Sequence, residues 1–228
     1  SIDAWPRECS FDTEFSRPDT LIRYSVSDGG GRVWVIEADD HHAPSHPPHH
    51  VIMHNAVADL AFMRQLTGSS TTTYDDTMLA HSVLNSDLPH DLGYLGSMYA
   101  SINRWKHLVD MNPRMYSAGD AVGTWDVWQA LRAQFAFDPQ SEWIYRNSVL
   151  PLVPVIDRAH RHGVRVNRTR VKDVLKDLHE RREQAHWAAE AAIGQPRTHA
   201  KGDHGFNVGS PDQVSAWLYG VERIRPRR

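Results

Sequence analysis

In the first third of the chain, apolar and polar residues alternate in short runs, which is the period of half-buried β-strands. The segment Asp28-Gly29-Gly30-Gly31 separates two of these runs and predicts a tight hairpin turn between them. Further along, an amphipathic stretch with helical spacing lies between two short apolar or β-branched runs. We therefore predict strands at residues 8–15, 21–27, 32–38, 51–53 and 71–74, and a helix at residues 57–66.

The rest of the chain has mostly helical periodicity. Asp76 is of a residue type that caps helix starts, here a helix through Leu84, and Pro113 stands where a first helical turn tolerates proline. Further helices are predicted at residues 91–99, 113–134, 142–162 and 169–193, with a short one after Ser210-Pro211. Strands that come first and then alternate with helices predict an α/β fold, with a mixed sheet flanked by helices.

A histidine- and proline-rich run at residues 39–50 interrupts this pattern. It cannot form a helix, because proline lacks a backbone N–H and clashes with the preceding turn. This run could form a transition-metal site or a polar loop. We expect the loop, because proline-rich segments give no fixed ligand geometry. The histidines in question are His41, His42, His46, His49 and His50.

Composition narrows the classes of protein that the chain can represent. Its 228 residues suffice for one good core, or for one domain with a smaller appendage, and 40% hydrophobic content fits a globular protein. No apolar run is long enough to span a bilayer and no signal peptide is visible, so we expect no membrane partner. Because Cys9 is the only cysteine, an internal disulfide and a thiolate zinc site are excluded. We expect an intracellular protein, in the cytoplasm of a bacterial or phage-infected cell.

Charge is distributed unevenly along the chain. The net charge of −3 excludes a protein that wraps nucleic acid through bulk electrostatics. Between residues 146 and 183, however, basic residues outnumber acidic ones, so the part before them is the acidic one. The turn-like pair Asp138-Pro139 separates the two parts. We therefore predict an α/β domain at residues 1–138 and a helical region at residues 139–228.

Four carboxylates in this chain have the spacing of a metal site. Asp12 and Glu14 are two apart on a predicted strand, so both side chains project from one face. Asp59 comes where a buried strand meets a helix, and Tyr116 and Asp120 share one face of a later helix. Carboxylates held close together repel one another unless a cation lies between them, and hard oxygen ligands select Mg²⁺ or Mn²⁺.

In chain order these residues give DxE, then HNxxxD from His54, then YxxxD. This order resembles the three motifs of the proofreading 3′–5′ exonuclease domain of family A DNA polymerases, in the tyrosine branch of the DEDD exonuclease superfamily. The segments at residues 76–80, 88–92 and 105–107 are similar to those between the second and third motifs of that family. The resemblance implies a ribonuclease H-like mixed sheet of five strands.

The resemblance continues past the nuclease motifs. Residues 149–156, 161–166 and 206–213 are similar to the start of the thumb subdomain of the same polymerases. The palm and the fingers, which add nucleotides, have no counterpart in this sequence. We therefore expect no polymerase activity from this chain. The palm and the fingers could be supplied by another chain that acts as its partner.

The resemblance also implies a two-metal-ion mechanism with a role for each motif residue. Asp12 bridges two divalent cations, Mg²⁺ or Mn²⁺, while Glu14 and Asp120 complete the ion site that activates water. Asp59 holds the second ion, and Tyr116 orients the attacking water without binding metal. The expected activity is therefore removal of nucleotides from the 3′ end of DNA.

The expected substrate is the 3′ end of single-stranded DNA or a frayed primer terminus. Base-reading motifs are not visible, and stacking on aromatic residues tolerates any sequence. Near the motifs, candidate contacts to the nucleic acid are Asn55, Arg104, Lys106 and Arg114. Solvation at the surface would explain the three basic residues equally well.

Two departures from the family pattern leave open how the second motif is supported and which residues contact the terminal base, and other functions are also open. Residues 15–17 differ from the usual threonine-rich continuation of the first motif, and the run at residues 39–50 stands where the family has a helix. One alternative is an RNA-trimming exonuclease in the manner of ribonuclease D. Another is a non-catalytic nucleic-acid-binding remnant of a nuclease. The presence of all four acids and the tyrosine argues against it, because such a remnant would have lost its metal ligands. The chain could also be a piece of a longer polymerase.

Overall fold

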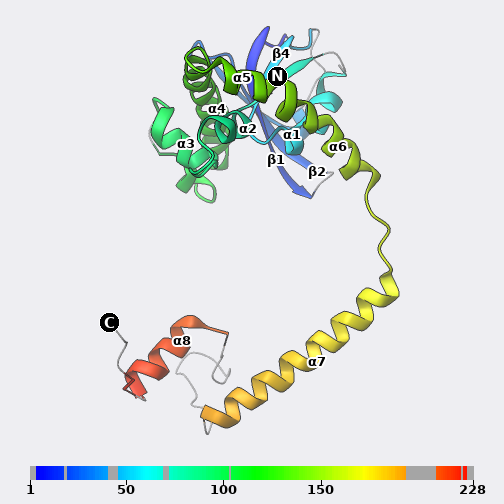
Figure 1. Cartoon of the computed structure of the whole chain (residues 1–228), viewed down its shortest axis with the longest axis vertical. Coiled ribbons are helices and arrows are strands. Elements are labelled where there is room, and N and C mark those ends of the chain that lie inside the picture. Colours follow the sequence, from blue (N-terminus) through cyan, green and yellow to red (C-terminus); the bar gives the residue numbers. More distant parts are fainter. Residues whose placement is uncertain are drawn as a thin grey trace. The chain divides into compact units, whose positions relative to one another are not determined.

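The computed structural model of this chain describes residues 4–17, 20–40, 46–68, 72–102, 104–193, 209–221 and 223–224. The chain forms two compact units, Ser1–Gly163 and Val164–Arg228 (Figure 1). The sheet and all motif residues predicted from the sequence lie in the first unit.

Five strands form one mixed sheet in the order β3-β2-β1-β4-β5. The first three strands pair antiparallel, while β4 runs parallel to both β1 and β5. The predicted mixed five-stranded sheet is thus confirmed, with β1 at its centre. The strands are β1 (Glu8–Arg17), β2 (Thr20–Ser27), β3 (Val33–Glu37), β4 (His50–Met53) and β5 (Thr73–Asp76).

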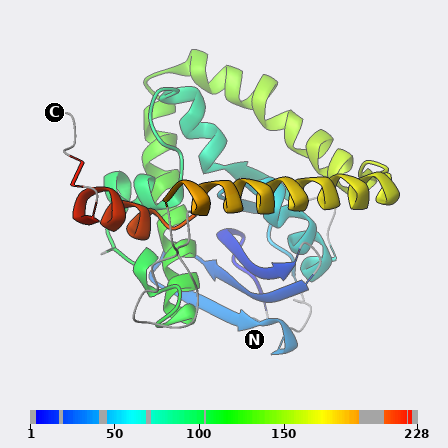
Figure 2. The ribbon, with the colours of Figure 1, turned by 90° about the horizontal axis from the view of Figure 1, so that it is seen from below.

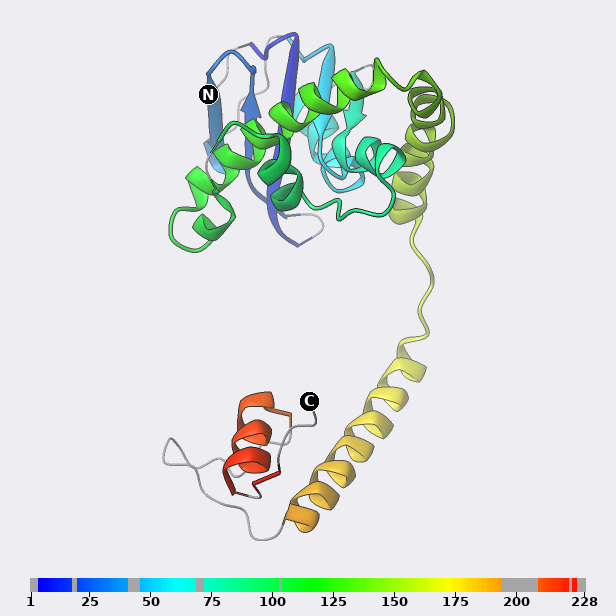
Figure 3. The same cartoon turned by 60° about the vertical axis from the view of Figure 1, so that its left-hand side comes forward.

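The sheet carries an apolar core on each face. On one face Phe11, Val51 and Met53 pack with Leu60 of α1, while on the other Ile52 packs with residues of α2, α3 and α4. The alternation Val51, Ile52, Met53 is that of a strand buried on both faces. Figures 2 and 3 show the long helix α4 lying across the strands, and it contacts β1, β2, β3 and β4. The helices are α1 (Ala56–Thr67), α2 (Thr77–Leu84), α3 (Leu92–Tyr99) and α4 (Pro113–Phe135).

Residues 139–163 belong to the first unit, although we predicted a domain boundary after residue 138. Tyr145 is fully buried, and its hydroxyl donates to Asp75 Oδ1 at 2.9 Å while accepting from the Asp76 backbone N–H at 2.8 Å. Val153 packs in the same core as Leu60 of α1. These contacts tie the segment to the sheet, so the structural boundary falls after Gly163.

The single helix predicted at residues 142–162 is wrong. The segment contains α5 (Pro139–Ile144), a π-helical turn (Tyr145–Val149), a 3₁₀ turn (Leu150–Leu152) and α6 (Val153–His162). Pro151 and Pro154 cannot donate backbone hydrogen bonds and therefore interrupt a continuous helix.

The segment at residues 39–50 contains no helix of more than one turn in its described part. A 3₁₀ turn covers Ala38–Asp40, and His50 already belongs to β4, one residue earlier than predicted. His50 Nε2 lies 3.0 Å from Asp75 Oδ2. His41 and His42 lie outside the described residues, and His46, His49 and His50 do not form a three-ligand cluster among those described.

The fifth strand also differs from its predicted position. We expected residues 71–74, but β5 covers Thr73–Asp76, and residue 71 lies outside the described residues. The strand continues through two aspartates because Asp75 and Asp76 are buried with hydrogen-bond partners inside the fold.

The second unit is helical, as predicted. Its elements are α7 (Arg168–Ile193), α8 (Pro211–Ser215) and a π-helical turn (Ala216–Val221). Residues 206–208 of the thumb-like sequence fall outside the described part of the chain. Among the helices that the structure describes, none is long and apolar enough to cross a membrane.

Candidate active site

Strand β1 carries polar residues on the face that α4 covers. Ser10 donates its hydroxyl hydrogen to the Ala121 carbonyl of α4 at 2.6 Å. Asp12 and Glu14 follow Ser10 at intervals of two residues and share its face, whereas Phe11 lies in the apolar core under α1. The two carboxylates thus share one face of the strand, as predicted, and the structure shows that this face is the one that α4 covers.

Three carboxylates meet at this place. One oxygen each from Asp12, Glu14 and Asp120 lie within 4.8 Å of one another, and Asp120 comes from the buried face of α4. Asp12 Oδ2 is buried and has no hydrogen-bond partner. An unpaired buried carboxylate oxygen is costly, and three hard oxygen donors around one point are the ligands that Mg²⁺ and Mn²⁺ prefer. The cluster therefore fits a divalent cation.

The electrostatics of the cluster agree with this fit. Burial, followed by the charges of Asp59, Asp120 and Glu14, raises the pKa of Asp12 well above its usual range. Burial and the charge of Asp120 also raise the pKa of Glu14. Negative charge is thus unfavourable here in the metal-free protein, and a bound cation would relieve the repulsion.

Asp59 approaches from the other side of β1. Its Oδ1 accepts hydrogen bonds from both the backbone N–H of Thr13, at 3.1 Å, and the Thr13 hydroxyl. Burial raises the pKa of Asp59 to about 7, against the opposing effect of these hydrogen bonds. Asp59 is close enough to raise the pKa of Asp12, but it does not belong to the three-ligand cluster. The structure thus brings all four predicted acids together around residues 12–14 of β1, with Asp59 oriented by Thr13.

The start of α1, which carries this fourth acid, is fixed by Asp76. The Asp76 carboxylate accepts from the backbone N–H groups of Asn55 at 3.2 Å and Ala56 at 2.7 Å. It also accepts from Met78 at 2.9 Å and Leu79 at 3.1 Å, which confirms the predicted cap of α2. One carboxylate therefore satisfies backbone donors at the starts of two helices.

Tyr116 and Asp120 share one face of α4 and contact the same lysine. Lys106 Nζ lies 2.6 Å from Asp120 Oδ1 and donates to Tyr116 Oη at 3.2 Å. Burial and the charge of Asp120 raise the pKa of Tyr116, so its hydroxyl keeps its proton near neutral pH. The sequence suggested Lys106 as a phosphate contact, but its contact with both residues of the third motif is visible only in the structure.

Trp105 is a further residue that builds this site and that sequence reasoning missed. Its indole Nε1 donates to Asp120 Oδ1 at 2.6 Å, and the ring is buried. Three glycines form the slot for the ring: a Cβ atom would lie 2.3 Å from it at Gly96, 2.4 Å at Gly119 and 2.7 Å at Gly123. Two of these glycines share α4 with Asp120, so the slot and the hydrogen bond together fix the carboxylate.

We expect Gly123→Ala to destabilise the protein, although alanine is ordinarily the better helix former. The added methyl group would collide with the Trp105 ring, and such overpacking typically costs about 1 to 3 kcal/mol. Chemical denaturation of the variant measures this loss. In a Trp105→Ala background the same change should be neutral or stabilising, and an equal penalty in both backgrounds would show that the slot is not its cause.

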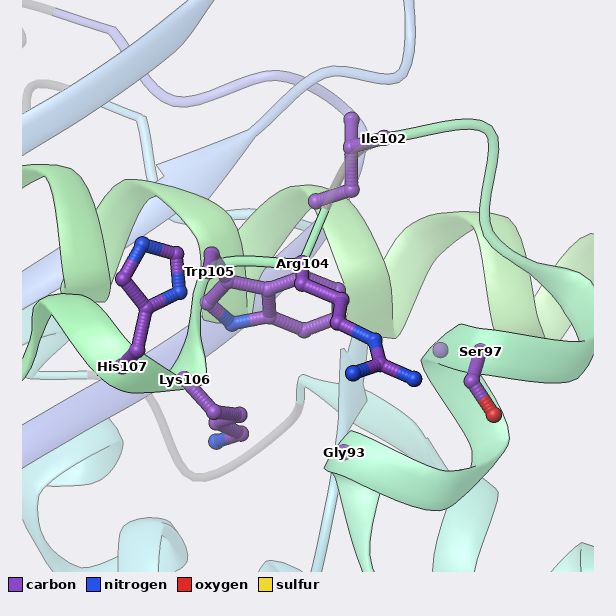
Figure 4. A pocket seen from close by; sticks show the side chains of 8 residues that line it. Gly93, Ser97, Ile102, Arg104, Trp105, Lys106 and His107 are labelled. Carbon is purple, nitrogen blue, oxygen red and sulfur yellow. The ribbon is translucent and has the colours of Figure 1, made fainter.

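The predicted contacts to nucleic acid are only partly gathered at the cluster. Asn55 is exposed at the start of α1, with a left-handed backbone. Arg104 lines a cavity of about 340 Å³ together with Lys106, and its guanidinium extends toward Ser97 (Figure 4). Arg114 instead binds Glu37 at 2.6 Å and the Val35 carbonyl at 2.9 Å. Lys106, which contacts Asp120, is therefore better placed than Arg114 to meet a phosphate near the acids.

Comparison by sequence gives no relative: no protein-family model matches the chain, and no curated protein matches it. Solved structures do match in fold. Brucella melitensis NrnC with bound Mg²⁺ has a TM-score of 0.53 and 19% identity, over 71% of this chain and 88% of NrnC. The ribonuclease H-like fold predicted from the sequence is confirmed by this likeness together with the sheet order.

Two longer proteins are also similar in fold. The POL domain of Pol1 from M. smegmatis, in complex with DNA primer-template and dNTP, has a TM-score of 0.56 at 16% identity. That alignment covers 96% of this chain and 38% of the polymerase chain. Escherichia coli RNase D, an exoribonuclease involved in structured RNA processing, has a TM-score of 0.52 at 16% identity. Here 70% of this chain and 46% of RNase D are covered.

Proposed function

We propose that this chain is a metal-dependent 3′–5′ exonuclease that removes nucleotides from the 3′ end of DNA, without polymerase activity of its own. The observation that carries the proposal is the cluster of Asp12, Glu14 and Asp120, with Asp59 beside Asp12, midway along β1. Fold likeness to NrnC and RNase D supports it. A carboxylate cluster of this kind suits phosphodiester hydrolysis, which needs charge stabilisation more than covalent chemistry.

The side chains divide the work of hydrolysis. Divalent cations bound here supply a water of lowered pKa and neutralise charge on the scissile phosphate. Asp12, Glu14 and Asp120 would hold the cation that activates the water, and Asp59 would hold a second cation from the Thr13 side of the strand. The hydroxyl of Tyr116 orients the attacking water by a hydrogen bond. Trp105 and the glycine slot keep Asp120 in its binding position.

Two observations favour DNA and a polymerase-related context. The alignment with the Pol1 POL domain covers 96% of the chain, so it must include residues of the second unit. The motif spacing and the thumb-like sequence after residue 149 resemble the same polymerases. We propose that the strand end is a single-stranded or frayed 3′ terminus, and that palm and fingers, if present in the cell, act as a separate partner.

Single-stranded DNA labelled at one end tests the proposal directly. A 5′-labelled strand should shorten one nucleotide at a time, whereas a 3′-labelled strand should release its label as mononucleotide at once. A chelator should stop both reactions, because the carboxylates act through bound cations. Internal cuts, release from the 5′ end, or activity that persists in excess chelator would contradict the assignment.

Trimming of RNA is the second candidate, favoured by the fold likeness to RNase D. The chemistry of the site is the same for both substrates, so the acids do not separate them. A comparison of DNA and RNA strands of the same sequence in one assay distinguishes the two substrates. A preference for RNA would replace the DNA assignment while leaving the cation site intact.

We expect Tyr116→Phe to weaken the nuclease and not to abolish it. The phenol orients water without holding metal, and one such hydrogen bond contributes roughly 1.5 to 3 kcal/mol, or about 10- to 100-fold in turnover. Turnover and Mn²⁺ affinity should be measured together, and the affinity should stay close to that of the wild type. Complete loss of turnover, or loss of Mn²⁺ binding, would indicate that the hydroxyl supports the metal site itself.

A further inference from the structure

Lys106 places a positive charge inside the acidic cluster. Its ammonium lies 2.6 Å from Asp120 Oδ1 and 3.2 Å from Tyr116 Oη, and 4.8 Å from the centre of the Tyr116 ring. Burial and neighbouring acids raise the pKa of Asp12 and Glu14, and the charge of Lys106 opposes both shifts. A single lysine thus acts on three carboxylates of the site.

The backbone next to Lys106 is held firmly. Trp105 occupies the glycine slot, and the 3₁₀ turn Lys106–Leu108 follows it directly. Trp105 Nε1 and Lys106 Nζ both approach the same oxygen, Asp120 Oδ1. A neutral donor and a cation therefore share one acceptor, and only the lysine carries charge that competes with a metal ion.

A divalent cation bound by Asp120 would be repelled by an ammonium 2.6 Å from that carboxylate. The lysine can avoid this repulsion by turning on its flexible stem. Its side chain is 38% exposed and lines the cavity of about 340 Å³ beside Gly93, Ser97 and Arg104 (Figure 4). The cavity thus gives the ammonium a second place, away from the carboxylate.

We propose that Lys106 is a built-in counter-ion of the acidic cluster. Its ammonium holds Asp120 and Tyr116 in place in the metal-free protein, and its contact with Asp120 breaks when a divalent cation binds that carboxylate. The inference rests on the proposed function only in taking Asp120 as a metal ligand. Lys106 is in this view a positioning residue, since it acts through Asp120 and Tyr116. The metal-free site is then kept in shape at the expense of metal affinity.

Calorimetric titration with Mn²⁺ of the wild type, Lys106→Met and Lys106→Arg tests this proposal. Removal of the competing charge should tighten Mn²⁺ binding about tenfold in Lys106→Met, while Lys106→Arg should stay near the wild type. Turnover of Lys106→Met should fall at the same time, because Tyr116 loses its partner. Arg104→Met removes a charge from the same segment without a contact to Asp120, so it should change Mn²⁺ affinity less than about twofold.

Thermal unfolding supplies a second readout. Lys106→Met should lower the melting temperature in excess chelator more than in saturating Mn²⁺, because the cation takes over the role of the ammonium. A lysine that only anchors the fold would weaken Mn²⁺ binding when removed. Unchanged or weaker Mn²⁺ affinity in Lys106→Met therefore overturns the inference. A wild type that binds no Mn²⁺ would instead overturn the proposed function, so the two failures are distinguishable.

Discussion

Asp12→Asn should reduce nuclease turnover by at least about a thousandfold while leaving the fold intact, because the change removes the central ligand charge and keeps the side-chain volume. In the metal-free protein the same change should raise the free energy of unfolding by about 1 to 3 kcal/mol, since the carboxyl has a strongly raised pKa and Asp12 Oδ2 has no hydrogen-bond partner. Turnover on labelled single-stranded DNA and chemical denaturation with chelator measure the two effects.

Asp157→Asn is the matched control. Asp157 is a buried aspartate of the same unit, but it binds Arg64 at 3.0 Å and Arg161 at 2.9 Å and lies outside the acidic cluster. Its replacement should lower stability by about 1 to 3 kcal/mol and leave turnover within about twofold. An Asp12→Asn variant that keeps a tenth or more of wild-type turnover would refute the role of Asp12 as a ligand.

Stability should respond to pH in opposite ways with and without metal. In the metal-free protein the pKa of Asp59 is raised to about 7, and burial raises the pKa of Asp12 well above its usual range. The folded state therefore favours their protonated forms, and the stability that they contribute is lost as pH rises through these values. Metal binding requires the ionised forms and strengthens with pH.

Between about pH 6.5 and about pH 8, we expect the metal-free protein to lose roughly 1 kcal/mol of unfolding free energy, because the Asp59 carboxyl, with a pKa of about 7, loses its proton over this interval. The stabilisation gained from saturating Mn²⁺ should grow over the same interval. His54, whose pKa burial lowers to about 4, adds a smaller change of opposite sign, because most of its effect falls below the ordinary histidine value of about 6.5. Denaturation series at both pH values measure this, and a metal-free protein that becomes more stable toward pH 8 would contradict the electrostatics of the cluster.

The elements that place the site follow from local patterns in the sequence. The strand period aims Asp12 and Glu14 at one face, and helical spacing puts Tyr116 and Asp120 on one side of α4. Asp76 was recognisable as a helix cap from its residue type and position. Each of these rules depends on residues a few positions apart, which is why the sequence alone supported them.

Contacts between distant segments were beyond those rules. The slot for Trp105 is made by glycines of α3 and α4, and a glycine inside a helix gives no sign of which ring it admits. Likewise the pair Asp138-Pro139 reads as a linker, but the burial of Tyr145 beyond it fixes the segment to the sheet. The short helical segments between residues 139 and 162 together have the apolar content of one long helix. The pattern of apolar residues therefore did not reveal the breaks at the prolines.

Four backbone N–H groups donate hydrogen bonds to the Asp76 carboxylate, and this limits which residues can replace aspartate at position 76. Asparagine has the same size, but its amino group would face N–H groups that need an acceptor, and glutamate would push its oxygens one carbon too far. Alanine would leave all four donors buried without a partner, at the starts of two helices at once. Position 76 is therefore among the least exchangeable in the molecule, although its side chain takes no part in the proposed chemistry.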